Sequence, residues 1–284
     1  MGERSQLSMP PELAERARAL VAAESTGDVS WTPPPVRDAA TVVMVRDDVD
    51  GLQVYLQRRV RTMAFAAGMH VFPGGAVEPQ DVVAAAALLA GRRDAASWPF
   101  ASRPNVSPGE DNLVNRVAAV RETFEETSHD LGDPFLLAYI GHWVTPAVED
   151  RRFDTRFYAA VVSGEHHIRE NSGESDAERW VRPADALAES AAGRMHMLPP
   201  TVATLADFAA AAALGENAEQ AIASIATPPI RPLMPSPTAD PVDPTGIRWR
   251  LVDFRDGEEI ASIGGPPAGS ESGGIHTSLG DLNE

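Results

Sequence analysis

The chain contains no cysteine. This absence excludes disulfide bonds, zinc–thiolate and iron–sulfur sites, and a thiol nucleophile. Long apolar runs are also missing: none approaches the roughly 18 residues of a membrane-spanning helix, and the alanine-rich stretch 82–90 is too short. The N-terminal residues lack the uninterrupted apolar core of a secretory signal. We therefore expect a cytoplasmic protein that does not insert into a membrane.

Positive charge is scarce. The 284 residues include 24 Lys and Arg against 41 Asp and Glu, which gives a formal net charge of −17. Such a field repels phosphate backbones and anionic lipid surfaces, so nonspecific binding to nucleic acid or to a membrane is unfavourable. Apolar residues make up 43% of the chain, as is usual for a globular protein large enough to bury a substantial core.

Composition divides the chain into four parts. We expect a helix and Pro-rich lead-in at 1–37, a central domain at 38–190, helices at 191–226 and a tail at 227–284. The tail has 9 Pro and 8 Gly in 58 residues, a level typical of disorder. We therefore predict that it is partly disordered, with only 247–254 able to pack against other residues.

Strand-like and helix-like segments are mixed along the chain, which predicts an α/β protein. A hairpin is expected from 40–46 and 52–58, because the turn-forming residues Asp47 to Gly51 separate them. Further strands are predicted at 69–72, 136–144, 156–162 and 179–181, and helices at 10–25, 81–93, 185–192 and 201–214.

The most informative segment is a predicted helix that starts with a capping box at 107–110 and ends near His129. At 100° per residue, one apolar stripe forms from Leu113, Val117, Val120 and Phe124. Glu122, Glu125 and Glu126 fall opposite this stripe. Three clustered carboxylates repel one another unless the face is solvated or a cation neutralises them, and carboxylate oxygens are the ligands that Mg²⁺ prefers.

Two neighbouring features favour a metal site over an ordinary wet acidic face. Arg121 precedes the first glutamate, where it can hold the orientation of a carboxylate. Gly74 and Gly75 follow a predicted strand in the sequence Phe-Pro-Gly-Gly, and paired glycines let the backbone approach a phosphate or a metal ion without a Cβ in the way.

With these residues the chain resembles the Nudix hydrolases, whose box is G-x5-E-x7-R-E-U-x-E-E-x-G-U, where U is a bulky apolar residue. Gly75 matches the first glycine, Asp81 stands where the first glutamate is expected, and 121–126 supply R-E-U-x-E-E. The sequence departs from the pattern in three ways. Residues 82–120 replace the usual seven, Thr123 replaces the bulky residue, and Ser128 and His129 replace the final G-U. The resemblance covers about 38–190.

The resemblance implies an α/β/α sandwich with a mixed β-sheet, an insertion at 82–111 inside the box, and hydrolysis of a nucleoside diphosphate linked to another moiety. It implies that Glu122, Glu125, Glu126 and the Gly75 carbonyl hold Mg²⁺, or Mn²⁺ in its place. For the extra base or ligand outside the box we choose Glu174, with Glu178 as the alternative. The expected catalytic residues are Glu125, Glu174 and Arg121, and the expected substrate-binding residues are Arg58, Arg59, Gly74, Gly75, Arg151 and Arg152.

With its interrupted box, the chain is similar to one branch of the family, that of the mammalian peroxisomal coenzyme A diphosphatase and its bacterial relatives. The stretches His-Trp-Val-Thr-Pro at 142–146 and Arg-Arg-Phe-Asp-Thr at 151–155 strengthen this similarity, as does, more loosely, the stretch 56–75. Coenzyme A or an acyl-CoA is therefore the expected substrate.

Other functions stay open from the sequence. Pro146 lies near the proline that marks ADP-ribose enzymes, whereas the S-Q-P-W-P-F-P motif of NADH pyrophosphatases is absent. A Nudix-fold binding or regulatory module without catalysis is a further alternative, although such modules usually lose the acids that this chain keeps. The sequence allows a homodimer but does not decide whether one forms.

Overall fold

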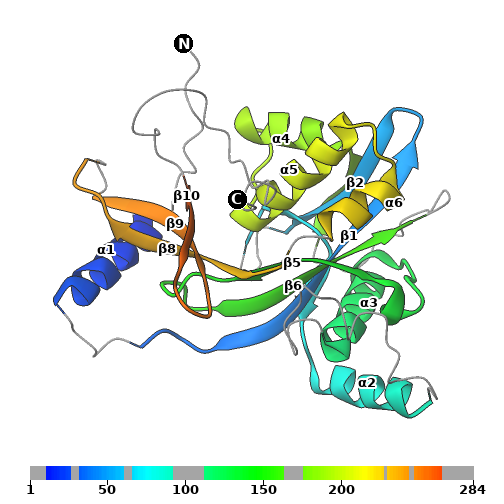
Figure 1. The fold of residues 1–284 in the computed structure, drawn as a ribbon, viewed down its shortest axis with the longest axis horizontal. Coiled ribbons are helices and arrows are strands. Elements are labelled where there is room, and N and C mark those ends of the chain that lie inside the picture. The colour runs from blue at the N-terminus through cyan, green and yellow to red at the C-terminus, as the bar shows by residue number, and fades with distance from the viewer. Residues whose placement is uncertain are drawn as a thin grey trace. The chain divides into compact units, whose positions relative to one another are not determined.

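The computed structural model describes residues 11–26, 32–60, 66–91, 112–162, 175–226, 229–242 and 246–263. They fall into two compact units (Figure 1). The first unit holds the described parts of 1–37, 142–154 and 231–276, and the second holds those of 38–141 and 155–230. Within the described ranges no helix is long and apolar enough to cross a lipid bilayer.

The first unit combines the N-terminal helix with strands from the C-terminal part of the chain. Helix α1 (Pro11–Thr26) contacts β8 (Pro232–Ala239) and β9 (Ile247–Asp253). Strand β9 pairs antiparallel with β8 and with β10 (Glu259–Ile263). A small apolar cluster joins the helix to this sheet and to the segment 147–148. It is formed by Ala17, Leu20, Val148 and Ile247, with Ala147 and Trp249 packed against it.

The expected disorder of the tail is therefore wrong for the residues of β8 and β10. Pro235 and Pro237 lie two residues apart in β8, so their missing N–H groups fall on the same edge of the strand. The other edge stays free to pair with β9. Composition alone does not record this spacing. The predicted packing of 247–254 is confirmed as β9, and residues 264–284 lie outside the described part.

The second unit contains the predicted hairpin. Strands β1 (Val36–Asp48) and β2 (Gly51–Arg59) pair antiparallel, and Gly51 takes the left-handed conformation at the turn, with φ 103°. β2 also pairs with β3 (His70–Val71) and β7 (Ser175–Val181), and β1 pairs with β4 (Gly74–Ala76). Strands β5 (Ala138–Val144) and β6 (Arg152–Val161) have residues in both units. β5 follows the 3-10 helix η2 (Pro134–Leu136), and its residues His142 and Trp143 pair in parallel with β8, which makes the sheet mixed.

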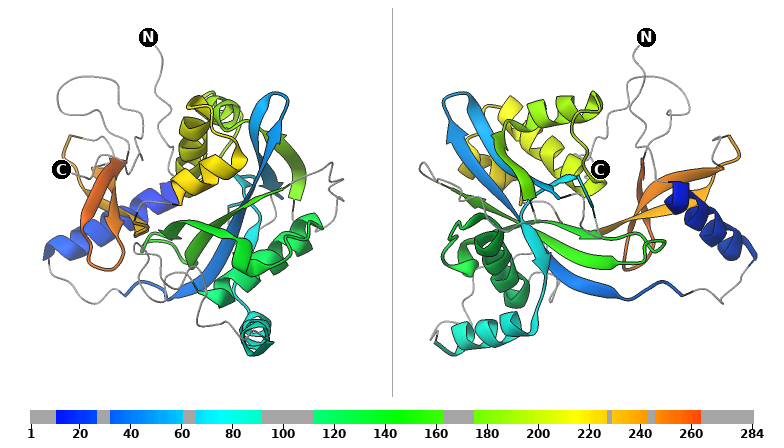
Figure 2. Two further views of the ribbon diagram at one scale, coloured as in Figure 1. Left: turned by 45° about the vertical axis from the view of Figure 1, so that its right-hand side comes forward. Right: turned by 180° about the vertical axis from the view of Figure 1, so that it is seen from behind.

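Helices cover both faces of the sheet in the second unit (Figures 1 and 2). On one face, Ala118 and Ala119 of α3 (Leu113–Thr127) pack against Ala40, Val42 and Met44 of β1. On the other lie α4 (Pro183–Ala191), α5 (Pro199–Ala213) and α6 (Ala218–Ile225). Helix α2 (Pro79–Gly91) packs on α3. The predicted α/β/α sandwich with C-terminal helices is confirmed, while residues 92–111 of the insertion lie outside the described part.

The start of α3 differs from the prediction. Asn112 is its N-cap, and the Asn112 side chain accepts a hydrogen bond from the backbone N–H of Asn115 at 3.0 Å. The expected capping box at 107–110 is outside the described residues and does not begin this helix. The helix ends at Thr127, because Ser128 adopts the left-handed conformation, with φ 57°, and donates its N–H to the Phe124 carbonyl.

Candidate metal and phosphate site

Helix α3 buries small and polar side chains in addition to Leu113 of its apolar stripe, and it leaves the other end of the stripe, Phe124, exposed. Phe124 is 55% exposed, whereas Thr123, Glu126 and Thr127 are buried and Glu126 is only 4% exposed. The short side chains of Ala118 and Ala119 let the helix lie close to β1. The helical spacing located the three glutamates correctly on one side, but it did not show that one of them would be buried.

The glycine corner at Gly74 and Gly75 lies against this helix. The backbone N–H of Gly74 donates to Glu126 Oε2 at 2.9 Å. A Cβ at Gly75 would overlap the carboxylate of Glu122, and a Cβ at Gly74 would overlap the carbonyl of Ala40. Glycine at 75 therefore lets the corner approach the Glu122 side chain of the helix, and glycine at 74 lets it approach β1. The predicted meeting of the glycine turn with the acidic helix is confirmed.

Arg121 joins the two halves of the interrupted box. Its Nε and Nη2 donate to the two carboxylate oxygens of Asp81 at 2.8 and 2.9 Å, a bidentate pair across 40 residues of sequence. Nη1 of the same guanidinium donates to Glu122 at 2.9 Å and to Glu125 at 3.0 Å. The bond to Asp81, which has no exposed surface, raises the pKa of Arg121. Asp81 thus lies where the box expects its first acid, and Arg121 orients two of the three glutamates.

Burial controls the electrostatics of the glutamates. Desolvation raises the pKa of Glu126 to about 7, against the hydrogen bonds from Gly74 and Gln57 and the charge of Arg59, which oppose the rise. Desolvation also raises the pKa of Glu122, although Arg121 opposes it. A cation placed between these carboxylates would favour their charged forms and offset part of the free-energy cost of their desolvation.

The side chains are not already gathered around one point. No group of three His, Asp or Glu side chains among the described residues is arranged to hold an ion. The reason is visible in their contacts, because Glu125 turns to Arg121 while Glu126 turns to Gly74 and Gln57. Glu125 is 53% exposed on its side chain, so it is free to leave Arg121 and join Glu122 and Glu126 around a cation.

The neighbouring arginines Arg58 and Arg59 point to opposite faces of β2, since side chains alternate along a strand. The charge of Arg59 acts on Glu126, so Arg59 lies on the face of the glutamates. Arg58 lies opposite His70 in the β2–β3 ladder, on the other face. Desolvation lowers the pKa of His70, and the charge of Arg58 lowers it further. The structure thus places Arg59 on the face of the glutamates and Arg58 on the opposite face of the strand.

The other predicted substrate arginines, Arg151 and Arg152, belong to the first unit. Arg152 is buried and donates to the backbone carbonyls of Pro34 at 2.9 Å and Thr145 at 3.2 Å. Its guanidinium is thereby used in the packing of that unit, and Arg151 is exposed. Contact of either residue with a substrate stays a prediction.

The predicted base Glu174 lies outside the described residues. The alternative, Glu178, is on β7 directly opposite Gln57 of β2. Its carboxylate acts on the hydroxyl of Tyr55: burial raises the pKa of Tyr55, and Glu178 and Glu126 raise it further. Glu178 therefore lies on the same face of the sheet as Glu126. Sequence reasoning missed Gln57, whose Nε2 donates to Glu126 Oε2 at 2.6 Å.

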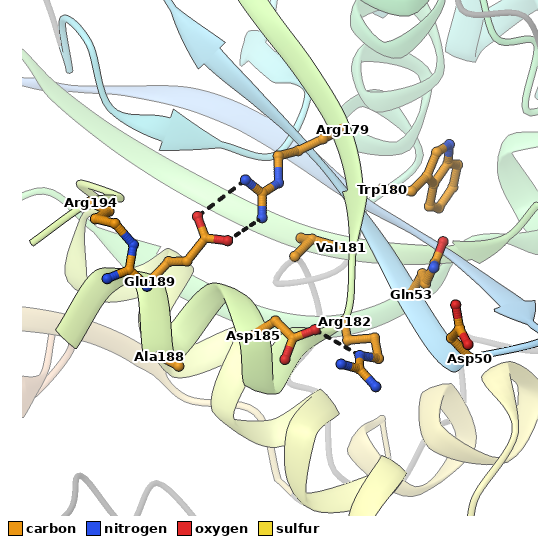
Figure 3. Close-up of a pocket in the computed structure, with 10 residues that line it drawn as sticks. All are labelled: Asp50, Gln53, Arg179, Trp180, Val181, Arg182, Asp185, Ala188, Glu189 and Arg194. Carbon is orange, nitrogen blue, oxygen red and sulfur yellow. Dashed lines mark hydrogen bonds and ion pairs between the residues drawn. The ribbon is translucent and has the colours of Figure 1, made fainter. Parts of the chain in front are cut away.

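A separate pocket of about 580 Å³ lies along β7 and α4 (Figure 3). Four of its six charged side chains already pair with one another. Arg179 makes a bidentate ion pair with Glu189 at 2.7 and 3.1 Å, and Arg182 contacts Asp185 at 2.7 Å. None of the glutamates of α3 lines it. Its walls are formed by Asp50, Gln53, Arg179, Trp180, Val181, Arg182, Asp185, Ala188, Glu189 and Arg194.

Comparison with known proteins points to one family. No protein-family model matches the chain. The Caenorhabditis elegans protein named "Putative nudix hydrolase 7" is 27% identical over 178 residues, which cover 58% of this chain and 58% of that protein. The match thus spans less than two thirds of that relative.

A solved structure agrees with this result. The crystal structure of a NUDIX hydrolase from Alicyclobacillus acidocaldarius is 27% identical, has a TM-score of 0.54, and covers 66% of this chain and 96% of its own. In sequence and in fold the chain is therefore similar to Nudix hydrolases, and the glycine corner, the bidentate pair of Asp81 with Arg121 and the glutamates of α3 agree with this similarity.

Proposed function

We propose that the protein hydrolyses a diphosphate linkage in a nucleoside diphosphate conjugate with the help of a divalent cation, and that coenzyme A or an acyl-CoA is its substrate. The observation that carries the proposal is the meeting of Glu122 and Glu126 with the Gly74–Gly75 corner. The backbone groups of the corner and the carboxylates of the helix therefore lie in the same small region, as a site for a metal ion and a phosphate requires.

The residues present fit a divalent cation. Glu122 and Glu126 are carboxylates whose charged forms are disfavoured by burial, so a nearby cation relieves an existing cost. Glu125 and the Gly75 carbonyl complete an all-oxygen set, which suits Mg²⁺ and also Mn²⁺. When bound, the cation lowers the pKa of a coordinated water and shields the phosphate charge.

The remaining chemistry belongs to the side chains of this chain. Arg121 holds Glu122 and Glu125 in place through Nη1. Water attacks one phosphorus, the bridging oxygen leaves with the other phosphate, and a carboxylate takes the proton of the water. Glu174 and Glu178 are the candidates for this base, and Glu178 has the support of lying on the glutamate face of the sheet. Arg59, on the same face, suits a phosphate oxygen, because its planar guanidinium donates several N–H groups.

Coenzyme A as the substrate is supported by the interrupted box and by the sequences at 142–146 and 151–155, which resemble those of the coenzyme A diphosphatase branch. The test is incubation of the full chain and Mg²⁺ with coenzyme A, acetyl-CoA, ADP-ribose and NADH. Release of adenosine 3′,5′-bisphosphate from coenzyme A is expected. Turnover of ADP-ribose without turnover of coenzyme A would refute the branch and favour the function suggested by Pro146.

The metal assignment has its own test. The double variant Glu125→Gln and Glu126→Gln is expected to lose turnover and to keep its fold by circular dichroism. The control neutralises two exposed acids of α1, Glu15→Gln and Glu24→Gln, and is expected to keep the wild-type rate. Full activity of the first double variant would eliminate the glutamates as metal ligands. We also propose that the protein is cytoplasmic, which imaging of the tagged chain tests, and that it forms a homodimer, which light scattering tests.

A further inference from the structure

One face of β2 carries a row of polar side chains beside the glutamates. The row, called the β2 row here, consists of Tyr55, Gln57 and Arg59, which alternate with Leu56 and Arg58 on the opposite face. Gln57 touches Glu126 directly. The hydroxyl of Tyr55 and the guanidinium of Arg59 are both close enough to Glu126 for their charges to interact.

Two members of the β2 row have a buried polar atom without a hydrogen-bond partner among the described residues. These atoms are Oε1 of Gln57 and Nε of Arg59, whereas the hydroxyl of Tyr55 interacts with Glu178. Tyr55 has no exposed surface and Gln57 is 2% exposed. Folded proteins leave few such atoms unpaired, because each one costs about 1–3 kcal/mol. Two in successive positions on one strand face, both beside the glutamates of α3, indicate groups that a ligand or its water completes.

The orientation of the Gln57 amide follows from its partner. Glu126 in its charged form can only accept hydrogen bonds, so the amide must direct Nε2 toward Oε2 of the glutamate, at 2.6 Å. Oε1 of Gln57 then lies on the other side of the amide and is left as an acceptor. Gln57 comes from β2, Glu126 from α3 and Gly74 from β4, so one carboxylate oxygen joins three elements.

We propose that Gln57 is a positioning residue of the metal site, with Nε2 holding Glu126 in place and Oε1 accepting a hydrogen bond from water in the hydration shell of the cation. This inference rests on the proposed function and adds a residue from outside the Nudix box. The free acceptor of Gln57 is complementary to the next member of the row, Arg59, which offers donors that suit phosphate oxygens.

The experiment measures binding of Mg²⁺ alone to the full chain by isothermal titration calorimetry, and turnover of coenzyme A separately. The variant Gln57→Met keeps the length of the side chain and removes both polar groups. The second variant, Gln57→Asn, keeps the amide but draws it back by one methylene. The control is Gln53→Met, a glutamine on the same face of the same strand, whose Oε1 accepts from Arg46 at 2.7 and 3.0 Å.

Both Gln57 variants are expected to bind Mg²⁺ at least 10-fold more weakly than the wild type, within the roughly 10–100-fold range seen when a partner of a metal ligand is lost. Their kcat is expected to fall by about as much while KM changes less than about threefold, because Gln57 acts through Glu126 and water. Gln53→Met should match the wild type in both measurements.

Mg²⁺ affinities of both Gln57 variants within twofold of the wild type would overturn the inference, and wild-type turnover in the same preparations would leave the proposed function standing. A wild-type chain that neither binds Mg²⁺ nor hydrolyses any of the conjugates would overturn both. A purely structural Gln57 would lower the unfolding temperature of the metal-free variants without changing the affinity of the folded protein, and that result also counts against the inference.

Discussion

Replacement of Glu126 by glutamine is expected to stabilise the metal-free protein at neutral and alkaline pH. Glu126 is 4% exposed, and burial raises its pKa from the ordinary 4.5 to about 7. Glutamine has the same shape and carries no charge. Its amide oxygen can accept the hydrogen bonds that Gly74 and Gln57 now donate to the carboxylate. The substitution therefore removes the cost of a buried charge and keeps the contacts.

The magnitude follows from proton linkage. Because the folded state holds the proton more tightly than the unfolded state, the stability contributed by Glu126 is fully present below pH 4.5 and is lost as pH rises through about 7. At about 1.36 kcal/mol per pKa unit, the whole loss is about 3 kcal/mol. About 2 kcal/mol of it falls between pH 5.5 and pH 8, a window that stays above the isoelectric point near 4.8.

The assay is urea unfolding in the presence of EDTA at pH 5.5, 7 and 8. The free energy of unfolding of Glu126→Gln is expected to exceed that of the wild type by a margin that grows by about 2 kcal/mol from pH 5.5 to pH 8. Mg²⁺ at 100 times its dissociation constant should stabilise the wild type by about 2.7 kcal/mol and the variant by much less. Glu125→Gln is the control, because Glu125 is exposed, and its margin should stay within about 0.5 kcal/mol at every pH.

A margin that does not change with pH would refute the reasoning about the buried charge. So would a metal-free wild type that is more stable than Glu126→Gln at pH 8. An equal response of wild type and variant to Mg²⁺ would show that Glu126 does not contact the ion.

Three further predictions concern other residues. Gly75→Ala should lower kcat by about 10- to 100-fold with little change in unfolding temperature, since its Cβ displaces the Glu122 carboxylate; Gly91→Ala, where a Cβ meets nothing within 4 Å, is the kinetic control. Asp81→Asn should lower the free energy of unfolding by about 3 kcal/mol in urea titrations, because it leaves Arg121 without its buried partner; Asp150→Asn, which breaks an exposed pair with Arg16, should cost under about 1 kcal/mol. In steady-state kinetics, Arg59→Ala should raise KM at least about 10-fold and Arg58→Ala less than about threefold, and equal effects would contradict their placement on opposite faces of β2.

The pairing of Asp81 with Arg121 shows that a sequence motif can identify contacts between residues that are distant in the chain. The two residues are separated by an insertion, part of which is outside the described residues, yet the box spacing assigned both to one site and their ion pair confirms it. The hairpin of β1 and β2 was equally accessible, because turn residues and alternation are local features. The roles assigned to Glu174, Arg151 and Arg152 stay predictions.

Errors arose where packing overrides the local pattern. Periodicity identified an apolar stripe on α3 that includes Phe124, but the helix turns Phe124 outward and buries Thr123 and Glu126. Short alanine side chains on that face allow closer approach to β1 than phenylalanine would. The tail composition predicted disorder, but β8, which contains three prolines, pairs with β9, and β9 pairs with β10.

By itself the sequence determined the elements whose signals are local: the hairpin, the acidic helix, the glycine corner and the acids that we propose to hold a divalent cation. Only the tertiary structure decided which of these groups meet. Gln57 and Glu126 are 69 residues apart in the chain, and their contact depends on how β2 and α3 pack. The choice between Arg58 and Arg59 depends on the same packing, since alternation separates them but does not say which face the helix covers. Contacts between distant segments follow from the packing of whole elements, and no local pattern of residues encodes that packing.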